Sequence, residues 1–197
     1  MQAFKILFLF LVLALNLSNV RAFVPVEAYT FDFNIETSRM GPVKEEKLIE
    51  AVELLREVFA SPEFKRKILL HRYNRRYQFA HNRGLSNYQI YKRILNGVEK
   101  LYPVKNNAMD VVVELYTNNN SIVMGYTNPF TQKIWMNTKY FNRHTPAEVA
   151  SHLTHEWLHK LGFGHERKKN DNRKYSVPYA IGYIVKEMAR ELDEDIR

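Results

Sequence analysis

Cysteine is absent from this chain of 197 residues, and glycine occurs only 7 times. Without cysteine the chain forms no disulfide bond, offers no thiolate to a metal and has no thiol to which a lipid could be attached. Acidic residues are also in the minority, with 21 Asp and Glu against 29 Lys and Arg, which gives a formal net charge of +8. The hydrophobic content of 46% is enough for one domain with a sizeable core, while the length is too short for two ordinary domains.

Long hydrophobic runs are scarce as well. The apolar stretch from Ile6 to Leu15 is too short for a comfortable membrane span. Lys5 precedes it, and Val20-Arg21-Ala22 places small residues where a signal peptidase cleaves. We therefore expect residues 1–22 to be a signal peptide and residues 23–197 to form a single domain. The mature protein is expected to be secreted or periplasmic, without stable insertion in a membrane.

The most informative segment is residues 155–165, which read HEWLHKLGFGH. On a helix, His155 and His159 project from the same face, so both imidazoles can bind one metal ion, and Glu156 can reach a water on that metal. Gly162 can end the helix in a left-handed conformation and return His165 to the same ion. Three neutral ligands leave a fourth position for water, as in a catalytic zinc site. The alternative, a buried helix whose histidines are satisfied by core hydrogen bonds, accounts for one such histidine but poorly for three.

This segment resembles the HExxHxxGxxH signature of the metzincin clan of zinc metallopeptidases, and Glu166 extends the likeness toward the astacin-type HExxHxxGFxHE. The resemblance implies a metzincin-like zincin catalytic domain of the α+β class, in which a small mixed sheet, an active-site helix and packing helices surround Zn²⁺. One feature departs from the family. Metzincins place a methionine beneath the zinc, often as Ser-x-Met, and here Ser176-Val177-Pro178 has proline at that place.

The function predicted from these residues is that of a secreted zinc-dependent endopeptidase acting on a peptide or protein substrate. His155, His159 and His165 would bind the metal, and Glu156 would be the catalytic residue. Glu156 would first accept a proton from the zinc-bound water and later pass it to the leaving nitrogen.

Three further residues near the motif have open roles. His152 lies on roughly the same helix face as the ligands and is interpreted as an outer or surface histidine rather than a ligand. Tyr179 is either a core aromatic at a helix start or a phenol in the site; the tyrosine position of the astacin pattern, counted from Pro178, falls on Ala180. Glu166 is interpreted as a member of a surface ion pair.

Helix signals are strong at three places. Thr145-Pro146-Ala147-Glu148 is a capping box that predicts a helix from about Pro146 to Leu161. Apolar spacing predicts a helix from Glu45 to Ala60, which Ser61-Pro62 ends. A second capping box at Ser86 predicts a helix that continues to Pro103, and a closing helix is expected from about Tyr179 to Asp193.

Strand signals occupy the centre of the chain. β-Branched and apolar residues predict strands at Met109 to Thr117, Ser121 to Thr127 and Gln132 to Asn137. In the metzincin fold the strand before the active-site helix lies along the cleft and pairs with an extended substrate. By that resemblance, Lys133 to Asn137 would be the exposed edge.

An alternative function comes from the basic and aromatic stretch Glu63 to Arg83. An exported polyanion-binding or nucleic-acid-binding protein with a structural zinc site could use such residues to contact phosphates and stack on bases. We favour an ordinary solvated face with core aromatics and expect no nucleic-acid partner, because no named nucleic-acid motif is present and the chain carries an export signal.

Overall fold

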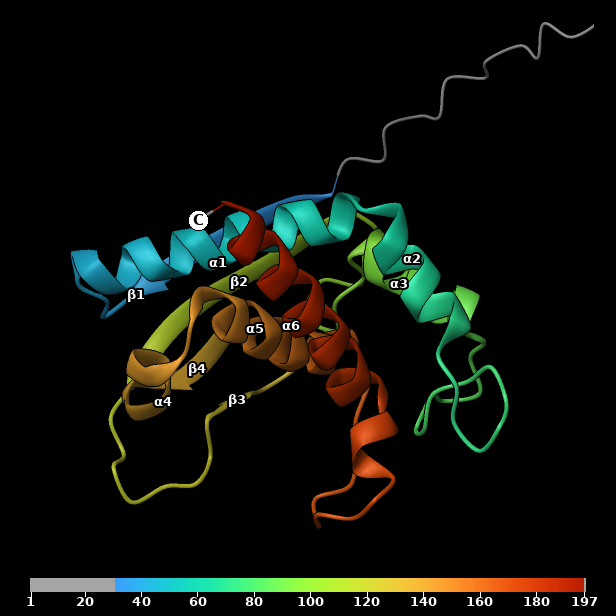
Figure 1. Cartoon of the computed structure of the whole chain (residues 1–197). Helices are drawn as coiled ribbons and strands as arrows, with labels where there is room; N and C mark the ends of the chain where they lie inside the picture. The colour runs from blue at the N-terminus through green and yellow to red at the C-terminus, as the bar shows by residue number, and fades with distance from the viewer. Residues whose placement is uncertain (1–30, 197) are drawn as a thin grey trace, which may run out of the picture.

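The computed structural model describes residues 31–196, with a four-stranded mixed sheet at its centre (Figure 1). The strands lie in the order β1-β2-β4-β3. β1 (Asp32–Ser38), β2 (Ala108–Tyr116) and β4 (Lys133–Asn137) are parallel, and β3 (Gly125–Thr127) pairs antiparallel with β4. β2 is buried along most of its length because it lies inside the sheet and its residues are mainly apolar.

Three helices form the core with this sheet. α1 (Pro42–Ala60), α5 (Pro146–Lys160) and α6 (Val177–Ile196) pack against one another, and α1 and α5 also contact the sheet. Fully buried aliphatic and aromatic side chains from all three helices meet there, including Leu55, Val58, Leu153, Trp157, Ile181 and Val185. This packing fixes α5, which carries the motif.

Three shorter helices complete the described fold. α2 (Pro62–Leu70) and α3 (Asn87–Asn96) lie against each other, and α4 (Thr138–Arg143) follows β4 directly. A 3₁₀ turn at Arg173–Tyr175 precedes α6. The described residues thus form a mixed α+β structure with a small mixed sheet, as predicted from the sequence, and six α-helices.

Two long connections lie side by side at one end of the molecule. The α2–α3 loop (residues 71–86) meets the α5–α6 loop (residues 161–176), where the amide of Ala80 donates to the carbonyl of Tyr175 at 2.9 Å. The ring centroids of Tyr73 and Tyr175 lie 5.5 Å apart across the same contact. Both loops are rich in Lys and Arg.

The predicted helices are confirmed, with corrections at their ends. α5 begins at Pro146 as expected, and α1 starts three residues before the predicted Glu45, because Pro42 is a good first helical residue. α3 does not continue to Pro103. It ends at Asn96, because Gly97 adopts a left-handed conformation with φ 63° and closes the helix.

The strand predictions need larger corrections. Only Gly125–Thr127 of the predicted strand from Ser121 to Thr127 is paired, and Lys133–Asn137 is an interior strand, not the exposed edge, because β3 covers its outer side. β1, α2 and α4 were not predicted. The predicted signal peptide, residues 1–22, lies outside the described residues. Within residues 31–196, no helix is long and apolar enough to span a membrane.

Candidate metal centre

The N-terminus of α5 is fixed by the predicted capping box. The Thr145 side chain accepts a hydrogen bond from the amide of Glu148, and the Glu148 carboxylate accepts one from the amide of Thr145. Leu153, Trp157 and Leu158 are fully buried against the core. The helix is therefore held at its start and along its apolar face, which determines where its remaining side chains point.

The structure brings together the three predicted ligands. His155, His159 and His165 each offer a ligand atom, and these atoms all lie within 4.8 Å of one another. The centroids of the imidazole rings lie 5.0 to 5.3 Å apart. Among the residues that the structure describes, these three form the one group of His, Asp and Glu side chains close enough together to hold a metal ion.

Gly162 makes the turn that returns His165 to the other two histidines. Its φ of 91° lies in the left-handed region that favours glycine. Its carbonyl accepts a hydrogen bond from Arg83 Nη1 at 2.8 Å, and a Cβ at this position would lie 2.9 Å from that same nitrogen. The backbone conformation therefore favours glycine here, whereas the contact with Arg83 involves the movable end of a side chain.

Backbone carbonyls orient two of the imidazoles. His159 Nδ1 lies 2.8 Å from the carbonyl oxygen of Phe163, and His165 Nδ1 lies 2.9 Å from that of Glu166. Since a carbonyl only accepts, each Nδ1 carries the proton and donates it, which leaves the Nε2 lone pair free for a metal. The hydrogen bonds of the turn therefore select the tautomer that a metal ligand needs.

Burial also keeps the three histidines uncharged. Desolvation lowers the pKa of His155, His159 and His165, and neighbouring imidazoles and the charge of Arg173 lower it further; for His165 the neighbouring imidazole is that of His81. The backbone hydrogen bonds of His159 and His165 oppose this shift without cancelling it. At neutral pH the imidazoles are unprotonated, so a metal ion does not have to displace protons from them.

Glu156 lies beside the ligands and is 5% exposed. No described residue donates a hydrogen bond to its carboxylate; the ring nitrogen Nε2 of His152 lies 3.8 Å from Oε1, which is beyond hydrogen-bonding distance. Desolvation raises the pKa of Glu156 to about 8, although Lys160 opposes the shift. A buried carboxylate without a partner is the kind of group that proteins keep for function.

His152 is not one of the converging ligands, in agreement with its interpretation, but it is buried rather than on the surface. Its Nε2 has no hydrogen-bond partner. The backbone of β3 passes directly over it, because a Cβ on Gly125 would lie 2.3 Å from His152 Nε2. His152 therefore fills the space between Glu156 and the edge strand of the sheet.

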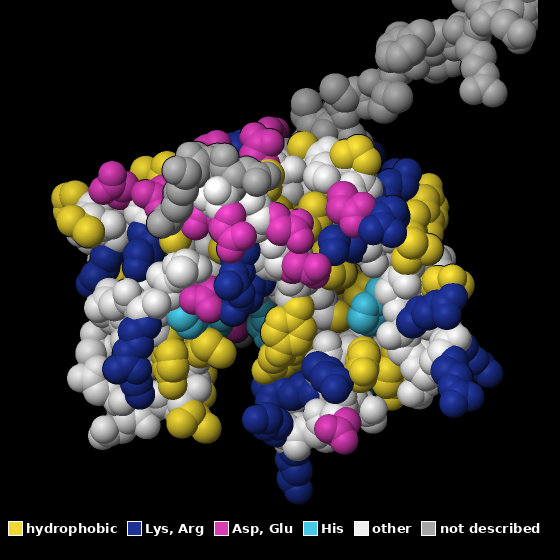
Figure 2. All heavy atoms as spheres, in the orientation of Figure 1, with side chains coloured by type: hydrophobic (Ala, Val, Ile, Leu, Met, Phe, Trp, Pro, Cys, Tyr) yellow, Lys and Arg dark blue, Asp and Glu magenta, His cyan; other side chains and the backbone are white. Residues whose placement is uncertain are grey.

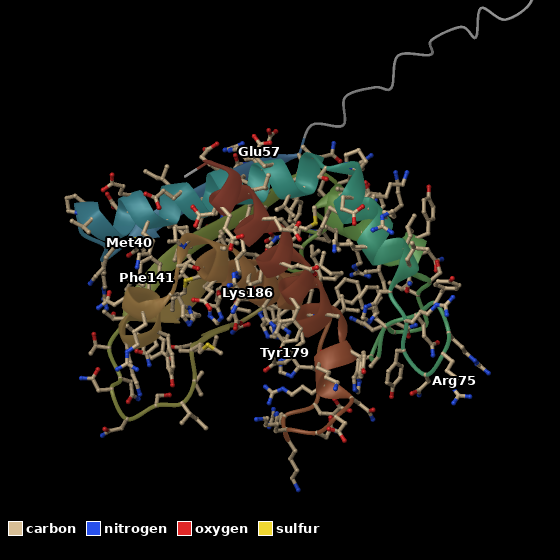
Figure 3. All side chains as sticks on the ribbon, viewed as in Figure 1. Met40, Glu57, Arg75, Phe141, Tyr179 and Lys186 are labelled. Carbon is tan, nitrogen blue, oxygen red and sulfur yellow. The ribbon has the colours of Figure 1, made fainter. Side chains whose placement is uncertain are left out.

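Tyr179 belongs to the site, although sequence spacing favoured a core position. Its ring centroid lies 4.5 Å from that of His155 and 4.8 Å from that of His165 (Figure 3). Desolvation raises the pKa of its phenol. Tyr179 comes from the first turn of α6, and only the packing of α6 on α5 places it beside the motif.

The structure also shows the surroundings of Glu166 and of residues 176–178. Glu166 Oε1 lies 2.7 Å from His81 Nε2, which lowers the pKa of Glu166 and agrees with the predicted surface pair. Ser176, Val177 and Pro178 are buried at the start of α6. In place of a methionine turn, the chain thus has the first turn of a helix at this point.

The opposite face of α5 contains a second group of buried polar side chains. Trp157 Nε1 donates to Glu99 Oε1 at 2.6 Å, and the amide of Asp110 donates to the same oxygen at 3.2 Å. Lys160 Nζ donates to the carbonyls of Thr131 and Lys133. This group ties α5 to β2, β4 and the loops before them.

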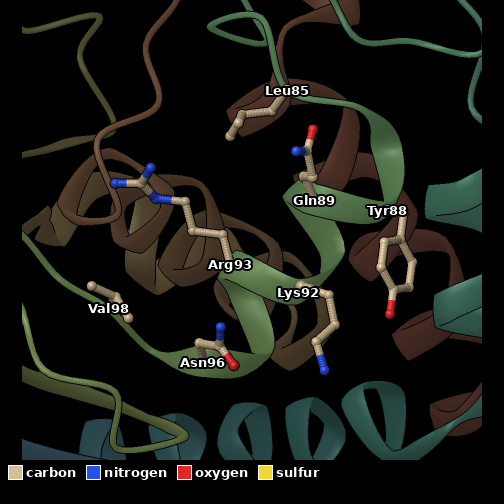
Figure 4. Close-up of a pocket in the computed structure, with 7 residues that line it drawn as sticks. All are labelled: Leu85, Tyr88, Gln89, Lys92, Arg93, Asn96 and Val98. Atoms are coloured by element: carbon tan, nitrogen blue, oxygen red, sulfur yellow. The ribbon is translucent and has the colours of Figure 1, made fainter.

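The space-filling view shows a hollow with histidine and acidic side chains at its inner end and Lys and Arg side chains gathered on one of its side walls (Figure 2). A separate surface hollow of about 380 Å³ lies on α3 and its flanks (Figure 4). The latter is lined by neither a carboxylate nor a histidine, so we assign it no chemistry.

Comparisons with known proteins leave the site to be interpreted from its own geometry. No protein-family model matches this chain, and a search of curated proteins gives no match.

Proposed function

We propose that this chain is a zinc-dependent endopeptidase in which His155, His159 and His165 bind the metal and Glu156 is the catalytic residue. One observation carries the proposal: three imidazoles converge from a helix and a glycine-terminated turn, and an unpartnered carboxylate lies beside them on the same helix. A structural site would not need that carboxylate.

The donor set favours zinc. Three neutral imidazoles without a thiolate are the ligand set of catalytic zinc sites, which keep a fourth position for water or substrate. When bound, zinc would polarise a carbonyl group and lower the pKa of water. The carbonyls of Phe163 and Glu166 would hold two of the three imidazoles in the orientation required.

Glu156 would act as base and then as acid. Burial raises the pKa of Glu156 although Lys160 opposes the rise, and its carboxylate is therefore a stronger base than that of an exposed glutamate. The carboxylate would accept a proton from the attacking water and pass it to the leaving nitrogen. Because Glu156 makes no hydrogen bond in the described structure, it is free to exchange partners.

The substrate would bind along β3 rather than along β4. β3 is the outer strand of the sheet, it contacts α5, and its Gly125 lies against His152. The free edge of a short strand can pair with an extended peptide through backbone hydrogen bonds. This arrangement keeps the substrate-pairing role expected from the metzincin resemblance and transfers it to the neighbouring strand.

The likeness to metzincins supports the proposal in two respects: the HExxHxxGxxH spacing and the left-handed Gly162. The site differs from the family in the buried Pro178, where a methionine is expected. Export of the protein is part of the proposal and depends on residues 1–22.

The alternative of polyanion binding rests on the stretch Glu63 to Arg83. Two of its aromatic side chains, Phe64 and Phe79, are buried in the core and are not available to stack on bases. The guanidinium of Arg72 covers the ring of Tyr77 at 4.2 Å. The burial of these rings supports the interpretation of a solvated face with core aromatics.

The decisive experiment measures zinc stoichiometry and cleavage of denatured proteins for the wild type and for Glu156→Gln. We expect one zinc per chain in both proteins and a loss of turnover of at least about 10²- to 10⁴-fold in the variant. As a matched pair, His165→Ala should weaken zinc binding far more than His152→Ala. Full activity in Glu156→Gln, or equal zinc affinity in the two histidine variants, would contradict the proposal.

A further inference from the structure

Arg173 is a cation at the metal centre that the mechanism above does not use. Its guanidinium carbon lies 4.8 Å from the centroid of the Tyr179 ring, and that ring contacts both His155 and His165. Arg173 therefore borders the same cleft as the metal ligands, on the side formed by the α5–α6 loop and the start of α6.

The backbone of Arg173 is held firmly. Its amide donates a hydrogen bond to Asn170 Oδ1 at 2.9 Å, and its carbonyl accepts one from Ser176 Oγ at 2.7 Å. The residue begins the 3₁₀ turn that leads into α6. These bonds fix the point from which the side chain of Arg173 extends, and the contact with the Tyr179 ring places its guanidinium, so that less freedom is lost when a ligand binds.

The charge of Arg173 is not neutralised by the protein. It forms no ion pair with any carboxylate of residues 31–196, and its Nε is buried without a hydrogen-bond partner. A divalent metal bound by the three histidines would add to this positive charge. An arginine presents a fork of donors that matches a carboxylate, and a partly desolvated one binds it most strongly.

The surrounding surface has the same sign. The α5–α6 loop contributes exposed cations at Arg167, Lys168 and Lys169, and one of its two acidic side chains, Glu166, is paired with His81. Figure 2 shows Lys and Arg side chains gathered on the wall of the hollow where Figure 1 places the α5–α6 loop. This wall attracts anions toward Arg173.

We propose that Arg173 determines specificity by binding a carboxylate of the substrate close to the bond that is cleaved. The proposal rests on the peptidase function proposed above. The carboxylate belongs either to an Asp or Glu side chain or to the free C-terminus of a peptide, and both sources present the same chemistry to the guanidinium.

Paired peptides test this assignment on the zinc-loaded protein. One arm compares peptides with Glu and with Gln near the cleaved bond, and the other compares free with amidated C-termini. We expect the wild type to prefer the charged member of one pair by about 10- to 100-fold in kcat/KM, mainly through KM, the range expected for one charge-assisted hydrogen-bonded pair. The arm that shows the preference identifies the source of the carboxylate.

Variants at this position should shift the preference in a graded way. Arg173→Gln should abolish it, Arg173→Lys should keep part of it, and Arg173→Glu should favour a basic residue instead. The matched control is Lys174→Gln, since Lys174 is exposed, adjacent in sequence and directed at the ring of Tyr175. It should keep the wild-type preference. A wild type without preference, or a preference that survives in Arg173→Gln, overturns the proposal.

A binding measurement separates this proposal from the peptidase function. If the wild type binds zinc but cleaves no peptide, the peptidase function fails, and Arg173 is then tested by intrinsic fluorescence with N-acetylglycine and N-acetylglycinamide, which differ only in the carboxylate. We expect the acid to bind more tightly than the amide to the wild type, and this difference to vanish in Arg173→Gln. Equal binding of the two probes to the wild type would refute a carboxylate site at Arg173.

Discussion

The two polar faces of α5 differ in whether their buried side chains have hydrogen-bond partners. Toward β2 and β4, Trp157 and Lys160 are fully buried and donate hydrogen bonds to Glu99, Thr131 and Lys133. Toward the cleft, Glu156 accepts no hydrogen bond from a described residue, and His152 Nε2 has no partner. We call these the structural face and the site face of α5.

The difference shows which buried polar groups serve the fold and which are kept for chemistry. A buried polar group without a partner is unfavourable by about 1–3 kcal/mol, so the site face is expected to reduce stability and the structural face to add to it. Glu99 itself is not fully satisfied, since its Oε2 has no partner, and burial raises its pKa. Its other oxygen nevertheless accepts two hydrogen bonds, whereas Glu156 accepts none.

The largest effect is expected on the structural face. Glu99→Met removes the acceptor for Trp157 Nε1 and for the Asp110 amide, and it leaves the buried charge of Lys160 without a nearby carboxylate on that side. We expect the free energy of unfolding to fall by about 3–5 kcal/mol in urea titrations. Zinc stoichiometry and kcat of the folded fraction should stay unchanged.

Trp157→Phe provides the control for this prediction. It removes one donor but keeps most of the buried ring, so it should lower stability less than Glu99→Met, and the two losses should not add in the double variant. If Glu99→Met were neutral, the distinction between the two faces of α5 would be lost.

The second effect is a pH dependence on the site face. In the metal-free protein, the pKa of Glu156 is raised from 4.5 to about 8, so the folded state binds a proton that the unfolded state releases above pH 4.5. The contribution of Glu156 to stability therefore falls as the pH rises from about 4.5 to 8, by up to about 1.4 kcal/mol per pH unit.

Glu156→Gln isolates this contribution, since the histidines titrate in both proteins. We expect the variant to be about as stable as the wild type near pH 4.5 and more stable by about 2–3 kcal/mol at pH 7. Thermal unfolding of the metal-free proteins across this pH range measures the difference. A stability difference that is constant with pH would show that Glu156 is not buried in the manner described.

Features of α5 that depend on neighbouring residues could be predicted from the sequence, and those that depend on distant residues could not. Capping boxes and glycine turns are local, so α5 and the return of His165 after Gly162 follow from neighbouring residues. β1 depends on pairing with β2, across more than 70 residues, and its own sequence alternates too weakly to show it. Tyr179 and Glu99 come to α5 from distant parts of the chain, and only tertiary packing reveals them.

A smaller effect is expected where β3 passes over the site face. In Gly125→Ala the new Cβ would lie 2.3 Å from His152 Nε2 and 2.5 Å from the carbonyl oxygen of Trp135. Because the second contact is with backbone, β3 must shift, and we expect a loss of about 1–3 kcal/mol in stability together with a lower kcat/KM. Gly41→Ala is the control, because nothing lies within 4 Å of its Cβ position.

The His152→Ala background sharpens this prediction. It removes the ring contact but not the contact with Trp135, so it should recover only part of the loss in Gly125→Ala. Complete recovery would mean that His152 alone limits the approach of β3 to α5, while no loss in the single variant would contradict the close packing of the strand on the site face.

The smallest effect concerns the start of α5, which supports both faces equally. Thr145→Ala removes the side-chain acceptor for the Glu148 amide, and we expect a loss of about 1 kcal/mol in the free energy of unfolding. Ser86→Ala is the matched control, since Ser86 and Gln89 form the same capping box on α3, away from the histidines, and it should give a similar loss. Zinc affinity should be unchanged in both variants, because α5 is held by its packing against α1 and α6 and the ligands lie at least two turns beyond the cap. A tenfold weaker affinity for zinc in Thr145→Ala alone would show that the site face depends on the helix start and not on the packed core beneath it.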